Sequence, residues 1–110
     1  MRDKGLMAGS SEMMVLKLLS EADMYGYQIT DELRRRSQNV FEMKAGTLYP
    51  LLHTLESKGY VTVYESTHDG RVRKYYSITK EGSKALSEKT ESWREFSAAV
   101  EHVMAEVAYA

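Results

Sequence analysis

The sequence predicts a mainly α, α+β fold in which three helices are followed by a two-stranded β-ribbon and a long final helix. Three observations support this prediction. Apolar residues recur every three or four positions in three successive segments before residue 59, as on one face of an amphipathic helix. Residues 60–78 are rich in β-branched and aromatic types and contain a central Asp-Gly pair, which is typical of a hairpin. No Pro or Gly interrupts residues 83–110.

The first two helices precede residue 37. We expect the first to begin at Ser10 or Ser11, both of which are good N-caps, and to end near Glu21. Asp23 is predicted to cap the second helix. The apolar residues of this second helix lie four positions apart: Tyr25, Ile29 and Leu33.

The third helix is predicted over residues 45–58, and Gly59 suits the position just after its end because glycine accepts positive φ. Pro50 allows two arrangements. Either the helix proper begins at Thr47, which places Pro50 in the first turn, or it begins earlier and bends. The apolar stripe of the helix consists of leucines: Leu48, Leu51, Leu52 and Leu55. The other face carries small or hydrogen-bonding side chains.

The ribbon and the final helix follow. The strands are expected at residues 60–66 and 72–78, with the turn at 67–71. Tyr76 and Ile78 alternate with Tyr75, so we expect them to face the core. Thr79 is predicted to cap the final helix. A heptad-like apolar seam, interrupted by Lys89, runs along this helix: Leu86, Trp93, Phe96, Val100, Val103 and Val107.

This final helix is expected to pair with a second copy of the chain. At roughly 1.5 Å per residue it forms a rod on the order of 42 Å, too long for its seam to be buried on one small core. We therefore divide the chain into a domain over residues 1–79 and a dimerisation helix over residues 80–110.

Three helices followed by a β-ribbon is the element order of a winged helix-turn-helix, a fold that places its third helix in the major groove of DNA. The charge pattern agrees with this interpretation. Lys and Arg outnumber Asp and Glu by 9 to 6 over residues 31–80, whereas residues 81–110 hold 3 basic and 6 acidic residues. The basic middle of the chain can meet phosphates.

Several other classes are excluded or disfavoured. The chain has no Cys, which rules out disulfides and thiolate metal sites, and no catalytic arrangement or phosphate-cradling glycine loop is visible, so we expect no enzyme activity and no cofactor. The three histidines lie on separate expected elements, and we predict no metal site. No apolar run is long enough to span a membrane and no signal peptide is visible, so a cytoplasmic location is expected.

Three blocks of sequence resemble the signatures of PadR-type transcriptional regulators, and they occur in the same order and spacing. These blocks are residues 24–29 (MYGYQI), 46–56 (GTLYPLLHTLE) and 70–79 (GRVRKYYSIT). Residues 91–96 (ESWREF) resemble the dimerisation helix of the short, PadR-s2-like class that includes multidrug sensors. The resemblance implies a homodimeric winged helix that represses transcription from a palindromic operator in double-stranded DNA and is released by a small molecule.

Positions that match the family motifs imply a DNA-binding set, to which we add Lys44. This set comprises Tyr27, Lys44, Thr47, Tyr49, Pro50, His53, Thr54, Arg71, Arg73, Lys74 and Tyr75. The resemblance also implies a dimer or ligand interface of Trp93, Phe96, Val100 and Val103. Trp93 has two interpretations: it packs the dimer, or it holds a planar apolar effector as the matching Trp does in multidrug-sensing relatives.

Two functional hypotheses remain besides an enzyme, which ranks last. The first is the homodimeric DNA-binding repressor. The second is a winged-helix dimer that binds small molecules or proteins and lacks DNA recognition. The net charge of −1 and the modestly basic ribbon motivate this alternative.

Overall fold

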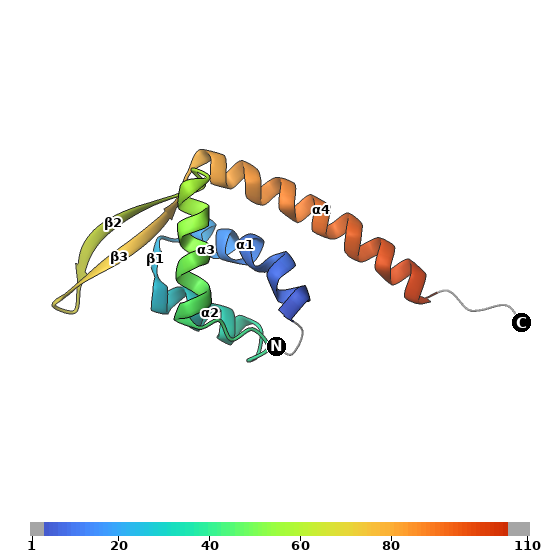
Figure 1. The fold of residues 1–110 in the computed structure, drawn as a ribbon, viewed down its shortest axis with the longest axis horizontal. Coiled ribbons are helices and arrows are strands. Elements are labelled where there is room, and N and C mark those ends of the chain that lie inside the picture. The colour runs from blue at the N-terminus through green and yellow to red at the C-terminus, as the bar shows by residue number, and fades with distance from the viewer. Residues whose placement is uncertain (1–3, 106–110) are drawn as a thin grey trace, which may run out of the picture.

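The computed structural model describes residues 4–105 and confirms the mainly α winged-helix fold (Figure 1). The elements in chain order are α1 (Lys4–Glu21), β1 (Met24–Tyr25), α2 (Gly26–Arg36), α3 (Ala45–Ser57), β2 (Val61–His68), β3 (Arg71–Ile78) and α4 (Lys80–Ala105). The three strands form one antiparallel sheet in the order β1-β3-β2. The hairpin of β2 and β3 projects from one end of the molecule, and α4 leaves toward the other (Figure 1).

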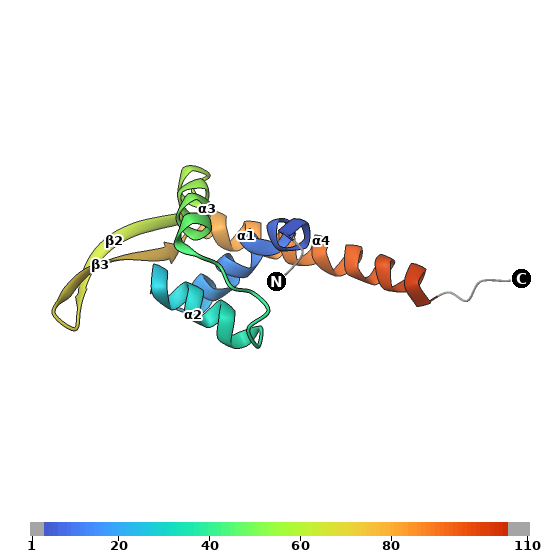
Figure 2. The same ribbon diagram turned by 60° about the horizontal axis from the view of Figure 1, so that its bottom comes forward.

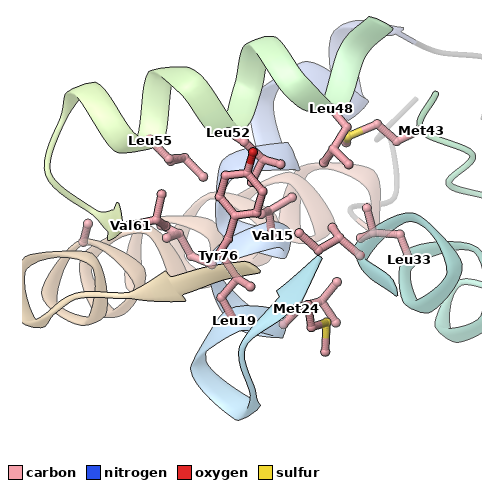
Figure 3. Packing of buried hydrophobic residues seen from close by; sticks show 14 residues of the cluster. Val15, Leu19, Met24, Leu33, Met43, Leu48, Leu52, Leu55, Val61 and Tyr76 are labelled. Carbon is pink, nitrogen blue, oxygen red and sulfur yellow. The ribbon is translucent and has the colours of Figure 1, made fainter. Parts of the chain in front are cut away.

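The hydrophobic core lies between α1, α2, α3 and the inner face of the sheet. The predicted leucine stripe of α3 points into it: Leu48, Leu52 and Leu55 are buried, and Leu51 packs at its edge. Beneath α3 lies the ring of Tyr76, close to Leu52 (Figure 3). Tyr76 is buried and Ile78 packs against the core, which confirms the expected inward face of β3.

The predicted starts of the first two helices are wrong. α1 begins at Lys4, and Ser11 is a buried residue inside it, not an N-cap. α2 begins at Gly26, where the backbone N–H of Tyr25 donates a hydrogen bond to Oε1 of Gln28 (3.1 Å). Asp23 does not cap this helix, because its carboxylate accepts a hydrogen bond from the hydroxyl of Tyr64 (2.6 Å).

The sheet has a third strand that the sequence pattern does not predict. β1 is two residues long and pairs with β3, with Met24 opposite Tyr76 and Tyr25 opposite Tyr75. This pairing joins the start of α2 to the ribbon. The wing is therefore hydrogen-bonded to the helical domain along part of its length.

α3 begins at Ala45, so the arrangement in which it starts at Thr47 is wrong, and Pro50 lies inside the helix. The end of the helix agrees with the prediction. Gly59 has a φ of 79°, and Tyr60 N–H donates to the carbonyl of Leu55 (2.9 Å) while Gly59 N–H donates to that of Glu56 (2.9 Å). This pair of hydrogen bonds is a Schellman motif, which satisfies the last carbonyls of a helix.

The tip of the hairpin is tighter than predicted. The strands extend to the pair His68–Arg71, which leaves only Asp69 and Gly70 in the turn. Both turn residues have positive φ, 52° and 76°. Positive φ at both central residues is the requirement of a type I′ turn, whose twist matches that of the flanking strands.

A compact joint links α3, the sheet and α4. The hydroxyl of Thr79 donates to the carbonyl of Gly59 (2.6 Å) and accepts from the N–H of Gly82 (3.0 Å), which confirms Thr79 as the cap of α4. The N–H of Thr79 donates to the carbonyl of Tyr60 (3.0 Å). At Gly82 the helix passes so close to this carbonyl that a Cβ atom would collide with it.

Only the first part of α4 packs on its own domain. Gly82 and Ala85 are buried, and Leu86 packs against the core, so the prediction that Leu86 belongs to the partner-facing seam is wrong. Lys89 forms an ion pair with Glu12 of α1 (3.4 Å). The C-terminal part of the helix extends away from the other elements in both views (Figures 1 and 2). Its 26 residues span about 39 Å, and Val107 lies outside the described residues.

Replacing Gly82 should therefore destabilise the fold. The Cβ atom of Gly82→Ala would meet the backbone carbonyl of Tyr60, which cannot rotate away as a side chain can. We expect the free energy of unfolding to fall by about 1–3 kcal/mol, the usual cost of overpacking. Urea unfolding at fixed protein concentration measures it.

Gly9→Ala is the matched control, because Gly9 also lies in a helix and has open space where its Cβ would be. We expect it to raise the free energy of unfolding by up to about 1 kcal/mol, since Ala has the higher helix propensity. Equal unfolding midpoints for the two variants would contradict the role of the joint.

Candidate nucleic-acid interface

The outer face of α3 is open to solvent. Its predicted DNA-facing residues are all exposed: Thr47, Tyr49, Pro50, His53 and Thr54. Ser57 at the end of the helix is exposed as well. The wing does not cover this face, because the ribbon extends to one side of α3 (Figures 1 and 2). The surface is therefore free to meet a partner.

Tyr49 lies against the start of α2. Its ring packs over Gly26, where a Cβ atom would lie 2.9 Å from Cζ of Tyr49 and still closer to the hydroxyl. Glycine at position 26 thus makes room for the tyrosine. Tyr27 and Lys44 line the same hollow of about 400 Å³, so the structure brings three of the predicted DNA-binding residues together.

The predicted wing residues fall into two groups. Arg71 and Lys74 are exposed. Arg73 and Tyr75 are half-buried on the outer face of the sheet, where Tyr75 stacks on Tyr64 with ring centroids 5.7 Å apart. Arg73 and Lys74 line a second hollow, about 310 Å³ in volume, together with Tyr27 and Tyr49. The base of the wing and α3 therefore share one concave surface.

The largest cluster of positive charge lies elsewhere and is neutralised. On α2, Arg36 forms ion pairs with Glu21 (2.6 Å) and Glu32 (2.7 Å), and Arg35 also pairs with Glu32 (2.7 Å). The hydrogen bond from Arg36 lowers the pKa of Glu21, and those from Arg35 and Arg36 lower the pKa of Glu32. These carboxylates are charged at neutral pH and offset the arginines.

The cations at the start of α3 and on the wing are not neutralised in this way. Among the ion pairs within residues 4–105, none involves Lys44, Arg71 or Lys74. Their charges remain available to an anionic partner. A protein of net charge −1 thus presents positive charge beside the exposed face of one helix.

A second exposed surface lies on α4. Its apolar side chains have exposed fractions of 45% for Trp93, 62% for Phe96, 43% for Val100, 73% for Val103 and 78% for Met104. We call these residues the α4 stripe. A contiguous apolar surface of this kind is typical of a contact with another molecule.

Trp93 lies between two hollows next to α1. One, of about 670 Å³, is also lined by Met13, Lys89 and Phe96. The other, of about 470 Å³, is lined by apolar residues of α1 and α2 such as Leu18 and Leu33. The predicted interface residues Trp93 and Phe96 therefore share a concave surface, whereas Val100 and Val103 lie farther along the helix.

Neither a metal site nor a membrane span is found in residues 4–105. Within that range, no group of His, Asp and Glu side chains could hold a metal ion. No helix there combines the length and the apolar composition needed to cross a bilayer.

Sequence reasoning missed Tyr25. The apolar spacing predicts Tyr25 as a position of α2, but it lies in β1, and its ring touches Tyr75 (centroids 5.4 Å apart) and Arg73 (Cζ 4.2 Å from the centroid). Its position directly before Gly26 in the MYGYQI block was the only available signal.

This fold, with an exposed third helix flanked by a wing and unpaired cations, defines a winged helix-turn-helix protein of the DNA-binding type. The model of the PadR-like family of transcriptional regulators matches residues 15–88. The chain belongs to this family, whose members are transcriptional regulators and not enzymes.

Individual relatives agree with this assignment. The chain is 35% identical over 74 residues to transcriptional regulator Rv3488 of Mycobacterium tuberculosis, covering 67% of this chain and 66% of the relative. It resembles the structure of a transcriptional regulator from Clostridium thermocellum, with a TM-score of 0.83, 32% identity and coverage of 93% and 99% of the two chains. A PadR family regulator from Clostridium difficile gives a TM-score of 0.78, 32% identity and coverage of 86% and 98%.

Proposed function

We propose that the protein is a cytoplasmic, homodimeric repressor that binds a palindromic operator through α3 and the wing and is released by a planar apolar ligand. The observation that carries the DNA-binding part is the outer face of α3. Its side chains are solvent-exposed, and Lys44 at the start of α3 and Arg71 and Lys74 of the wing are not neutralised by carboxylates of residues 4–105.

The proposed contact places α3 in the major groove. That groove is about 12 Å wide and accepts a helix whose outward side chains are compact or form hydrogen bonds. Tyr49, His53 and Thr54 satisfy this requirement and can reach base edges. Lys44 and the wing cations would contact phosphates, which adds affinity and orientation without reading sequence.

The proposed dimer uses the α4 stripe. The exposed fractions of Phe96, Val103 and Met104 are too large for a surface that remains in water, and burying apolar area is favourable by about 25 cal/mol per Å². A second copy of α4 presents the same stripe and would form a self-complementary, two-fold interface. Such a dimer would hold two copies of α3 about 34 Å apart, one turn of DNA.

The proposed effector site is at Trp93. Two copies of this ring near a two-fold axis would form a flat apolar slot suited to planar aromatic molecules. The hollows that Trp93 lines support this placement. A ligand that binds better when the subunits are tilted would shift the dimer away from the spacing that fits DNA, and operator affinity would fall by the same coupling free energy.

The alternative is a winged-helix dimer that binds small molecules or proteins and not DNA. The two hollows at Trp93 are the observation in its favour. Affinity for duplex DNA at several salt concentrations separates the two functions, because phosphate contacts make binding fall steeply as salt rises.

The residue assignments on α3 can be tested with duplexes selected from a random pool. We expect Tyr49→Ala to weaken binding to the selected duplex by about 1–3 kcal/mol through loss of a groove contact. We expect Lys44→Ala to weaken binding to all duplexes and to reduce the salt slope by about 1 per protomer, as each subunit of the dimer loses one phosphate contact. Fluorescence anisotropy measures both.

Arg35→Ala is the matched control. Arg35 is also an exposed cation, but it pairs with Glu32 on α2, so its removal should leave the salt slope unchanged. If wild-type protein shows weak binding with a flat salt dependence, the repressor proposal is wrong and the alternative is favoured.

The α4 stripe makes a separate prediction about assembly. Val103→Glu places a charge on the stripe and should give a monomer, because an unpaired carboxylate is costly at an apolar interface. Ala98→Glu, on the opposite side of the helix, is exposed and should leave the dimer intact. Sedimentation velocity distinguishes them. A monomeric wild type, or equal effects of the two variants, would contradict the proposed interface.

Trp93 provides its own readout for the ligand, since it is the only tryptophan of the chain. Pyrene, a planar hydrocarbon, should quench its emission in wild type and not in a monomeric Val103→Glu variant, because the slot needs two subunits. Added pyrene should also weaken DNA binding. Equal quenching in monomer and dimer would show that the ligand site is not formed by the dimer interface.

A further inference from the structure

The outer face of the sheet, opposite the core, carries a cluster of aromatic side chains. Tyr64 of β2 is opposite Tyr75 of β3, and Tyr75 is opposite Tyr25 of β1, so the three tyrosines form one row across three strands. Tyr64 and Tyr75 stack with an interplanar angle of 15°, and Tyr25 meets the edge of Tyr75 at 77°. We call these three residues the tyrosine row.

The row is fixed at both ends. At one end the hydroxyl of Tyr64 donates a hydrogen bond to the carboxylate of Asp23, at 2.6 Å. This hydrogen bond raises the pKa of Tyr64, so the phenol stays protonated and remains a donor at neutral pH. At the other end Tyr25 is held by its pairing with β3 and by the start of α2. The rings therefore have little freedom to move.

Arg73 lies on the ring of Tyr25. Its guanidinium carbon is 4.2 Å from the ring centroid, within the range of a cation–π contact. Its Nε atom is buried and has no hydrogen-bond acceptor among the described residues, and none of the ion pairs there involves Arg73. No carboxylate of residues 4–105 therefore neutralises the guanidinium of Arg73, and its positive charge remains available to an anion.

The position of Arg73 indicates which contact this is. Arg73 and Lys74 line the hollow between the wing and α3, together with Tyr25, Tyr27 and Tyr49. Among these lining residues there are two cations and no carboxylate. A guanidinium stacked on an aromatic ring keeps N–H donors at its rim in a geometry that matches phosphate.

We propose that Tyr25 is a positioning residue for DNA binding: it holds the guanidinium of Arg73 at the rim of the hollow between wing and α3, where it contacts a backbone phosphate. This inference rests on the proposed function. Tyr25 itself need not touch DNA. By ordering a flexible arginine before binding, the ring removes part of the entropy cost of the phosphate contact.

The experiment measures the salt dependence of DNA affinity for the full chain. The probe is a random-sequence duplex of about 30 base pairs, which is long enough for two half-sites one turn apart. The variants are Tyr25→Leu, Tyr25→Phe, Arg73→Ala and the double variant Tyr25→Leu with Arg73→Ala. Tyr25→Leu and Arg73→Ala should each reduce the slope by about one phosphate contact per protomer. The double variant should have the same slope as either single variant. Tyr25→Phe keeps the ring and should keep the wild-type slope.

The slope separates positioning from a merely structural role. A variant that is only less stable has less active protein, but its folded molecules keep the wild-type slope. The inference would be overturned if Tyr25→Leu kept the wild-type salt slope. It would also be overturned if the decreases in slope of the two single variants added up in the double variant. Absence of salt-dependent binding in wild type would instead overturn the proposed function, so the two failures are distinguishable.

A second measurement does not depend on any variant folding. In ¹⁵N-labelled wild-type protein, the Nε–Hε resonance of Arg73 should be shifted by the Tyr25 ring and should change when the duplex is added. The resonance of Arg35, which is paired with Glu32, is the internal control and should not change. If the chemical shift of the Arg73 Nε–Hε resonance does not change when the duplex is added, the proposed phosphate contact is wrong.

Discussion

The joint around Thr79 is the constraint on which the arrangement of this protein depends. One hydroxyl connects the end of α3, through the carbonyl of Gly59, to the first turn of α4, through the N–H of Gly82. The carbonyl of Tyr60 accepts from Thr79 and lies directly against Gly82. Because these contacts are short and involve backbone atoms, they leave little room for α4 to change its angle to α3. The direction in which α4 leaves the domain is thereby set.

This geometry couples two surfaces that are far apart. The α4 stripe begins at Trp93, next to α1, and continues along the projecting part of the helix, whereas the exposed face of α3 lies beside the wing (Figures 1 and 2). A rigid connection lets a displacement at the stripe become a displacement of α3. In the proposed repressor, this connection is what would turn ligand binding at Trp93 into a change in the separation of two α3 helices.

Electrostatic pairing decides which of the positive charges can act on a partner. The run Arg34 to Arg36 is the most basic segment of the sequence, but Glu21, Asp31 and Glu32 pair with it. Lys44 has no basic neighbour in the sequence and Lys74 follows Arg73 on the wing, yet both remain unpaired with the carboxylates of residues 4–105. Arg73 differs from both groups, since it rests on the ring of Tyr25. The density of basic residues along the sequence therefore does not predict which cations of this fold remain unpaired.

Patterns within one element were sufficient to predict much of the fold. The leucine spacing of α3, the Asp-Gly turn and the Thr79 cap each depend on neighbouring residues, and each agrees with the structure. The errors have a common cause. Asp23 satisfies the local rule for an N-cap, but a tyrosine 41 residues away takes its carboxylate. Leu86 fits the heptad-like spacing, but the core of its own domain covers it.

The sequence alone therefore determined the order of the four helices and the two long strands, the inward face of α3 and the residues that its outer face presents, because helical and strand periods are properties of short segments. Tertiary structure decided the rest. β1 has only two residues and no period of its own, so its existence depends on pairing with a strand about fifty residues later in the chain. The tyrosine row, the contact of Tyr25 with Arg73 and the freedom of Lys44 likewise arise only when distant segments meet. Such contacts depend on which distant residues come close in space, and the spacing of residues along the sequence does not show this.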